Sequence, residues 1–292
     1  MHQPTFHVGD AVILEDGGTK LKGVVQLIKG PQLTIKTDDG HMHIRAATAV
    51  TPVCSTATSR RLLQVPPIHE RRVLLSQAIE MVAHGISPSL IVVGQPGLGK
   101  THEVTQTLQT MGLEPDHDYC YVKGFTSARG LFETLYAHNG RLTVFDDCDG
   151  ALNDGVATEI LKGALDSHHV RTISWLTAAR SSGKLPKSFR FDGQVMFISN
   201  RPVADIDESI LSRSLVIDYN MSREEILQYM ETILPLVESA ATAEQRRGGM
   251  EFIRKYAPRI KRLNIRTLIS VLRIITAHPT NWEPLAFYTV MQ

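Results

Sequence analysis

The stretch Gly94-Gln95-Pro96-Gly97-Leu98-Gly99-Lys100-Thr101 decides the fold of this chain. It matches the phosphate-binding pattern G-x-x-x-x-G-K-[ST]. The apolar run 90–93 before it is typical of a buried parallel strand, and residues 101–111 after it favour a helix. Backbone N–H groups of such a loop surround phosphate oxygens at the positive end of the helix. The residues expected to bind the nucleotide are Gly94, Gly97, Gly99, Lys100 and Thr101. In this site Lys100 reaches the β- and γ-phosphates, and the Thr101 hydroxyl ligates Mg²⁺.

The composition is that of an ordinary globular protein. The chain has 292 residues, of which 42% are apolar and 21% charged, with a net charge of +1. A nearly neutral chain gives no global argument for nucleic-acid binding, so any such argument depends on local patches. The cysteines Cys54, Cys120 and Cys148 form no C-x-x-C pair, which is typical of a reducing compartment without structural disulfides or zinc. No apolar run approaches about 18 residues, so we expect a cytoplasmic protein without a membrane partner.

Residues 1–53 read as a small β domain, and residues 54–67 as a linker rich in Ser, Thr and Pro. Short strand-like runs are expected at 10–14, 23–28, 32–37 and 41–45, with glycine-containing turns between them. The strand number and glycine placement resemble an SH3-like or KOW-like barrel. Five basic residues balance five acidic ones in this region, which favours a protein-docking or packing role over nucleic-acid binding.

The rest of the chain alternates strands and helices up to about residue 220 and is purely helical from 221 to 292. Alternation predicts a parallel sheet with helices on both faces, here over residues 68–220. The expected strands are 90–93, 119–122, 142–145, 195–198 and 215–217. Ser222 and Glu225 form a capping box that opens the helical region.

Polar residues follow the apolar strands where a phosphate site needs them. Asp146 and Asp147 end the strand 142–145, where the first carboxylate can hold Mg²⁺ and the second can orient or deprotonate the attacking water. Asn200 follows the strand 195–198 and could position that water. Arg213 precedes the last strand, and an arginine of this kind can stabilise the charge on a neighbouring subunit's γ-phosphate.

The order of these elements over residues 65–292 resembles the AAA+ ATPase module. The resemblance implies a P-loop α/β core with a five-stranded parallel sheet, a C-terminal helical lid and, before them, the small β-barrel. It implies that Lys100 and Thr101 are Walker A, and that Asp146 and Asp147 are Walker B. It further implies that Asn200 is sensor 1 and that Arg213 is an arginine finger acting in trans. Arg266 lies where sensor 2 is found, with Arg259 and Arg262 close by.

Two departures from the family pattern bear on function. The family usually has Glu where this chain has Asp147, and the shorter side chain suggests slow turnover. The usual aromatic-hydrophobic-Gly pore motif is also missing, and only Lys123-Gly124-Phe125 and Ala128-Arg129-Gly130 occupy that region. The second departure argues against peptide threading.

Two basic features bear on the client. Residues 170–175 and 188–191 can pair as a hairpin whose tip carries Arg180, Lys184 and Lys187, either to contact nucleic acid or as a solvated loop. The segment 246–273 carries nine basic residues against Glu251 alone. That segment suits a solvated helix face, a contact with a neighbouring subunit's acidic surface, or DNA.

These features predict an Mg²⁺-dependent ATPase that assembles with itself into a ring, expected to be a hexamer, or into a filament. The expected cofactors are ATP and Mg²⁺, and the expected client is DNA, RNA or a nucleoprotein complex, in the style of phage ATPases of DNA metabolism. A protein remodeller that uses residues 1–53 as its partner-binding adaptor is one alternative. A nucleotide-gated scaffold with slow turnover is the other.

Overall fold

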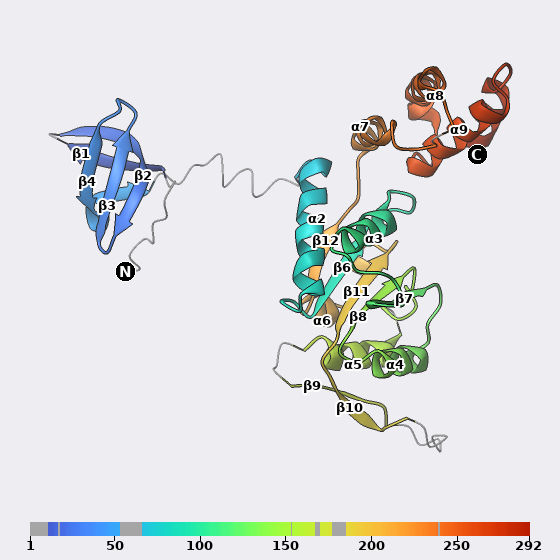
Figure 1. Cartoon of the computed structure of the whole chain (residues 1–292), viewed down its shortest axis with the longest axis horizontal. Helices are drawn as coiled ribbons and strands as arrows, with labels where there is room; N and C mark the ends of the chain where they lie inside the picture. The colour runs from blue at the N-terminus through green and yellow to red at the C-terminus, as the bar shows by residue number, and fades with distance from the viewer. Residues whose placement is uncertain are drawn as a thin grey trace. The chain divides into compact units, whose positions relative to one another are not determined.

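The computed structural model describes residues 11–16, 18–52, 66–152, 154–166, 170–176, 185–238 and 240–292. The chain divides into two compact units, Met1–Pro66 and Pro67–Gln292. Figure 1 shows the elements of both. Within the described part, no helix is long and apolar enough to cross a membrane.

The N-terminal unit is an antiparallel sheet with its own small core. Its strands are β1 (Ala11–Asp16), β2 (Thr19–Lys29), β3 (Gln32–Thr37), β4 (Met42–Ala46) and β5 (Val50–Pro52), in the order β4-β3-β2-β1-β5. Alternate side chains point inward, as a sheet with one buried face requires. The buried residues are Val12, Leu14, Val25, Leu33, Ile35 and Val50. The sequence did not predict β5, because three residues with a proline carry no strand pattern. The likeness to SH3 or KOW barrels stays a prediction.

The second unit contains the predicted five-stranded parallel sheet. Its strands are β6 (Ser89–Val93), β7 (Tyr119–Lys123), β8 (Leu142–Asp146), β11 (Gln194–Ser199) and β12 (Leu215–Asp218), in the order β12-β6-β11-β8-β7. All four strand pairs are parallel. The central strand β11 therefore lies between β6, which leads into the glycine loop, and β8, which ends in Asp146.

Helices cover both faces of this sheet, as Figure 1 shows. On one face lie α2 (Ile68–Ala83) and α3 (Lys100–Thr110), which share a core with Leu90 and Val92. On the other lie α4 (Ala128–Ala137), α5 (Gly155–Ala164) and the short α6 (Glu208–Leu211), which share a core with Ile91 and Val93. Alternate residues of one strand thus enter opposite cores, which explains the uninterrupted apolar run. The arrangement confirms the predicted parallel sheet with helices on both faces.

The predicted hairpin before β11 is present. β9 (Arg171–Ser174) pairs antiparallel with β10 (Ser188–Phe191), and Trp175 N–H donates to the Lys187 carbonyl at 2.7 Å. Lys187 is exposed beside β10. The other two predicted tip residues, Arg180 and Lys184, lie outside the described residues.

The C-terminal region is helical, as predicted. It contains α7 (Arg223–Ile233), α8 (Ala243–Tyr256), the 3₁₀ turn η3 (Ala257–Arg259), α9 (Ile265–Ala277) and α10 (Glu283–Val290). The capping box of Ser222 and Glu225 is confirmed at the start of α7. Apolar side chains of these helices belong to the same apolar cluster as those of α2 and α3.

Candidate functional site

The glycine loop between β6 and α3 has the backbone conformation of an anion-binding loop. The φ angles of Gly94, Gly97 and Gly99 are 157°, 81° and 90°, in the region that side-chain-bearing residues rarely adopt. Gly99 is the N-cap of α3. The N–H groups of residues 99–101 donate to no other residue that the structure describes. The first turn of α3 therefore presents unpaired donors, which suit phosphate oxygens.

Lys100 joins this loop to the end of β11. Its side chain is only 5% exposed. The Nζ atom donates to the carbonyls of Gly94 at 2.6 Å and Gln95 at 2.9 Å, and to Asn200 Oδ1 at 2.8 Å. The lysine and the asparagine predicted to act together are thus in direct contact.

The charge state of Lys100 is set by two opposing effects. Burial lowers its pKa to about 8, because the charged form loses hydration, while the carboxylates of Asp147, Asp146 and Asp149 favour the charged form. Arg266, exposed on the first turn of α9, lies near enough that its charge lowers this pKa further. The predicted sensor 2 residue is thus within electrostatic range of Lys100.

Asp146 is fully buried and accepts hydrogen bonds from several side chains. Thr101 Oγ1 donates to its two carboxylate oxygens at 3.1 and 3.2 Å. Two further groups bind the same carboxylate: the Tyr121 hydroxyl at 2.6 Å and Lys123 Nζ at 3.3 Å, both to Oδ2. Burial, and then the hydrogen bond to Asp146, raise the pKa of Tyr121, so its phenol stays a donor. Tyr121 and Lys123 were not predicted, and only the neighbouring position of β7 and β8 reveals them.

A hydroxyl beside a carboxylate is a donor set that Mg²⁺ prefers. Within the described part of the chain, no group of three or more His, Cys, Asp or Glu side chains could hold a metal ion. A magnesium ion at Thr101 and Asp146 would therefore complete its shell with phosphate oxygens and water, which is how Mg²⁺ usually binds nucleotides. The residues fit the metal that the sequence implies.

Asp147 and Asn200 form a second contact between strand ends. Asp147 has a φ of 56°, and its N–H donates to the Ile198 carbonyl at 3.1 Å. Asn200 Nδ2 donates to Asp147 Oδ1 at 2.6 Å. Asn200 thus contacts Lys100 through its oxygen and Asp147 through its nitrogen. This bridge is possible because β11 lies between β6 and β8.

A third carboxylate of the same loop, Asp149, was not predicted. Its Oδ1 accepts the Ser199 hydroxyl at 2.6 Å, and the Ser199 oxygen accepts the Arg201 N–H at 3.0 Å. These bonds fix the backbone on both sides of Asn200. The sequence offered a weak signal, since an Asp follows the predicted pair by two residues.

Among the predicted catalytic residues Asp147, Asn200 and Arg213, only Arg213 lies away from the other two. It follows α6, and its carbonyl accepts from the Ser89 hydroxyl at 3.2 Å, at the first residue of β6. The glycine loop begins at the other end of the same strand, about 13 Å away at ~3.3 Å per residue. The guanidinium donates to the Ser209 carbonyl at 2.7 Å.

The C-terminal helical region contacts the glycine loop directly. The Ile265 N–H at the start of α9 donates to the Gly97 carbonyl at 3.0 Å. A Cβ on Gly97 would lie 2.8 Å from Asn264 Cγ, so only glycine fits here. The Gln95 N–H donates to Asn220 Oδ1 at 2.8 Å. The sequence did not predict that Asn220 and Asn264 contact the glycine loop, because asparagines near helix starts usually serve only as caps.

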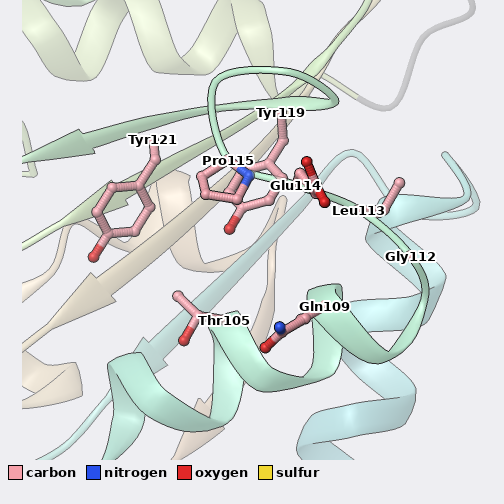
Figure 2. A pocket seen from close by; sticks show the side chains of 8 residues that line it. All are labelled: Thr105, Gln109, Gly112, Leu113, Glu114, Pro115, Tyr119 and Tyr121. Atoms are coloured by element: carbon pink, nitrogen blue, oxygen red, sulfur yellow. The ribbon is translucent and has the colours of Figure 1, made fainter.

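A pocket of about 620 Å³ lies beside this site, between α3 and the edge strand β7. It is lined by Thr105, Gln109, Gly112, Leu113, Glu114, Pro115, Tyr119 and Tyr121. Figure 2 shows Thr105 and Gln109 of α3 facing the two tyrosines of β7. Tyr121 belongs to both places, because its ring lines the pocket while its hydroxyl binds Asp146. The predicted phosphate-binding residues do not line this pocket.

Comparisons with known proteins give one sequence relative and several structural neighbours. No protein-family model matches the chain. An uncharacterized 36.7 kDa protein from the nrdC-mobD intergenic region of Enterobacteria phage T4 is 24% identical over 241 residues, covering 75% of this chain and 73% of that protein. A mutant RuvB of Thermotoga maritima aligns with a TM-score of 0.46 and 15% identity, over 76% of this chain and 68% of its own. A chain of the Escherichia coli MS115-1 HORMA:CdnC:Trip13 complex aligns with a TM-score of 0.44 and 12% identity, over 80% and 90%. At these values, the functional argument depends on the site itself.

Proposed function

We propose that this chain is an Mg²⁺-dependent ATPase. The observation that carries the proposal is a pair of hydrogen-bonded sets at the carboxyl edge of the sheet, joined through the neighbouring positions 100–101 and 146–147 of the chain. In the first set Lys100 contacts Asn200 and Asn200 contacts Asp147, and in the second Thr101 contacts Asp146. Together the two sets contain a buried lysine, a carboxylate bonded to a hydroxyl, and a second carboxylate with an amide partner, which are the parts that phosphoryl transfer to water needs.

Each side chain has a defined part in this proposal. Lys100 and the free N–H groups of residues 99–101 bind the phosphates. Thr101 and Asp146 would hold Mg²⁺, which neutralises phosphate charge when bound. Asp147 orients the attacking water or accepts its proton, and Asn200 keeps the Asp147 carboxylate in place through the 2.6 Å hydrogen bond.

We further propose that the active form is an assembly of several copies. Arg213 lies at the opposite end of β6 from the glycine loop of its own chain. An arginine finger at this place can serve only a neighbouring subunit. A ring or a filament satisfies this requirement, and the hexameric ring predicted from the sequence is one such assembly.

The client that we favour is nucleic acid. Exposed basic side chains support it, namely Lys187 at the β9–β10 hairpin and several residues of α8 and η3. Because phosphate contacts supply most non-specific affinity for nucleic acid, local patches suffice even in a chain of net charge +1.

One observation favours a protein client instead. Phe125 is 87% exposed in the loop between β7 and α4, two residues after Lys123, which binds Asp146. An exposed aromatic ring linked to the metal carboxylate could grip a polypeptide during turnover. The slow-turnover scaffold stays the third alternative, since it needs only binding of ATP.

The ATPase rate of the full chain tests these proposals together. We expect ATP hydrolysis that is lost in Lys100→Ala and retained in Lys29→Ala, an exposed lysine of β2. The rate is then measured with single-stranded DNA, duplex DNA, RNA and an unfolded polypeptide. Stimulation by nucleic acid supports the favoured client, whereas stimulation by the polypeptide that Phe125→Ala abolishes supports the protein client. ATP-dependent assembly without turnover indicates the scaffold, and hydrolysis by purified Lys100→Ala would contradict the site.

A further inference from the structure

The C-terminal helices carry a surface that the nucleotide site does not use. It combines basic and aromatic residues of α8, η3, the turn after η3, and α10. Its members are Lys255, Tyr256, Arg259, Lys261, Phe287 and Tyr288, here called the basic-aromatic surface. The segment from Lys255 to Arg262 has four basic residues and no acidic one.

Contacts between side chains make this surface continuous across two helices. Lys255 Nζ lies 5.1 Å from the ring centre of Tyr256. The Tyr256 and Phe287 rings meet edge to face at 5.2 Å. The Arg259 guanidinium lies 5.7 Å from the Phe287 ring centre. These contacts form one chain in which two rings in edge-to-face contact lie between two cations.

The basic groups of this surface lie against aromatic rings or solvent. In the described part of the chain, no carboxylate forms an ion pair with Lys255, Arg259 or Lys261. Other cations of the C-terminal region differ, because Arg254 of α8 binds Glu231 and Arg273 of α9 binds Glu238. The structure thus separates internally paired cations from unpaired ones.

Hydrogen bonds from α7 fix the backbone of the η3 turn, which carries Arg259. The Arg223 guanidinium of α7 donates to the carbonyls of Ala257 and Ile260, at the two ends of η3. Pro258 further restricts the backbone there. On α10, Tyr288 is 70% exposed next to the half-buried Phe287. A turn held in this way loses little conformational freedom when a partner binds.

We propose that the basic-aromatic surface binds single-stranded nucleic acid. Lys255, Arg259 and Lys261 would contact successive phosphates, and Tyr288 would stack on a base. Bases of a duplex are already stacked on one another, so an aromatic partner selects an unpaired strand. This proposal deepens the proposed function and rests on its nucleic-acid client, but it does not require ATP hydrolysis.

The test uses the full chain, a fluorescein-labelled oligothymidylate and no nucleotide. Fluorescence anisotropy should show binding that is at least about tenfold weaker in Lys255→Ala/Arg259→Ala at ~0.1 M salt, because two phosphate contacts are lost. The plot of log affinity against log salt should become shallower by about 1.4, at ~0.7 per contact. The charge-preserving variant Lys255→Arg/Arg259→Lys should bind as the unchanged chain does.

The matched control is Lys29→Ala/Lys36→Ala, which removes the same charge from exposed positions of the N-terminal unit. It should bind the oligonucleotide normally, and an equal loss in this control would contradict the proposal. Two variants test whether the aromatic ring of Tyr288 stacks on a base. Tyr288→Ala should bind the oligonucleotide about fivefold more weakly or worse, whereas Tyr288→Phe should bind it normally. Duplex DNA bound as tightly as the single strand would also contradict a stacking surface.

The remaining outcomes separate this proposal from the proposed function. If Lys255→Ala/Arg259→Ala binds the oligonucleotide normally but loses self-assembly by light scattering, the surface faces a second copy and the proposal is overturned. If this variant binds normally while single-stranded DNA still stimulates the ATPase, the nucleic-acid client stands and another surface carries it. If Lys100→Ala has no ATPase deficit but the surface variants lose binding, the proposed ATPase site fails and this inference holds.

Discussion

Two neighbouring carboxylates could activate water, and their contacts assign them different parts. Asp147 accepts from Asn200, whereas Asp149 accepts from Ser199 and so holds the end of β11. We expect Asp147→Asn to bind ATP and to turn it over at least about a hundredfold more slowly, the loss typical of a missing general base. Asp147→Glu should keep or increase the rate, because its carboxylate reaches further.

Asp149→Asn is the matched comparison, since its amide oxygen still accepts from Ser199. It should keep most of the rate. Steady-state hydrolysis and binding of a fluorescent ATP analogue check both variants. If Asp149→Asn hydrolysed ATP slowly while Asp147→Asn hydrolysed it at the normal rate, Asp149 and not Asp147 would be the residue that activates water.

The lowered pKa of Lys100 predicts a pH dependence of nucleotide affinity. Burial lowers this pKa from 10.5 to about 8, so the amine is charged below pH 8 and loses its proton above it. Affinity for ATP should be steady below pH 8 and fall above it, by up to about tenfold per unit. Lys100→Arg should show no such fall, because its guanidinium stays charged. Titration calorimetry at pH 7 and pH 9 measures both, with proton uptake on binding expected only for the lysine.

The same pKa has a consequence for folding with the opposite sign. Between pH 8 and 10.5 the unfolded chain holds its proton at Lys100 more tightly than the folded chain does. The free energy of unfolding therefore rises with pH across this window as far as Lys100 contributes. A fall of ATP affinity without a loss of fold in this window would separate the binding effect from denaturation.

At the scale of elements, the contact between the glycine loop and α9 makes a further prediction. Gly97 and Gly112 have φ angles of 81° and 79°, so alanine at either position imposes similar backbone strain. A Cβ on Gly97 would also lie 2.8 Å from Asn264 Cγ, whereas a Cβ on Gly112 meets nothing within 4 Å. Gly112→Ala should lose only the strain energy, about 1–2 kcal/mol. Gly97→Ala should lose more stability and most ATP affinity, because it also displaces the start of α9.

Thermal unfolding with and without ATP measures this difference. ATP should raise the melting temperature of Gly112→Ala as it does that of the unchanged chain, and should not raise that of Gly97→Ala. Equal stabilisation of both variants by ATP would mean that the contact with Asn264 is irrelevant to the site.

The central strands and the polar residues that follow them could be predicted from the sequence alone. Buried runs such as 90–93 predicted the central strands, because helices on both faces of a parallel sheet demand apolar residues at every position. The polar residues after these strands could be expected to meet, since carboxyl ends of parallel strands share one edge. Asp146, Asp147 and Asn200 were found in this way.

The missed residues depend on pairings between distant segments. Tyr121 and Lys123 reach Asp146 only because β7 pairs with β8, with Lys123 directly opposite Asp146. The sequence of β7 alone does not indicate which strand it pairs with. The role of Asn264 as the N-cap of α9 already explains an asparagine at this position. Its proximity to Gly97 therefore could not be predicted from the sequence. Local patterns thus predicted the strand-end residues, and the order of strands and helices determined the rest.

At the scale of the whole molecule, Arg213 makes the prediction that separates a single chain from an assembly. It lies beside Ser89 at the start of β6, at the opposite end of that strand from Lys100. We therefore expect Arg213→Ala to bind ATP and hydrolyse it poorly. Arg129→Ala, an exposed arginine of α4 that pairs with Glu133, should stay active.

Mixing two inactive variants tests whether Arg213 acts across a subunit boundary. Arg213→Ala subunits supply an intact Lys100 site, and Lys100→Ala subunits supply an intact arginine. At some subunit interfaces of a mixed assembly, an intact Lys100 site then faces an intact Arg213. Part of the ATPase activity should therefore return. Because arginine fingers acting in trans contribute about 10³–10⁵ in rate in GTPases, even a minority of restored boundaries should exceed the background of either variant. Light scattering confirms that the variants assemble together. If they do and no activity returns, Arg213 serves its own chain or the fold alone, and the site needs another cation at the boundary.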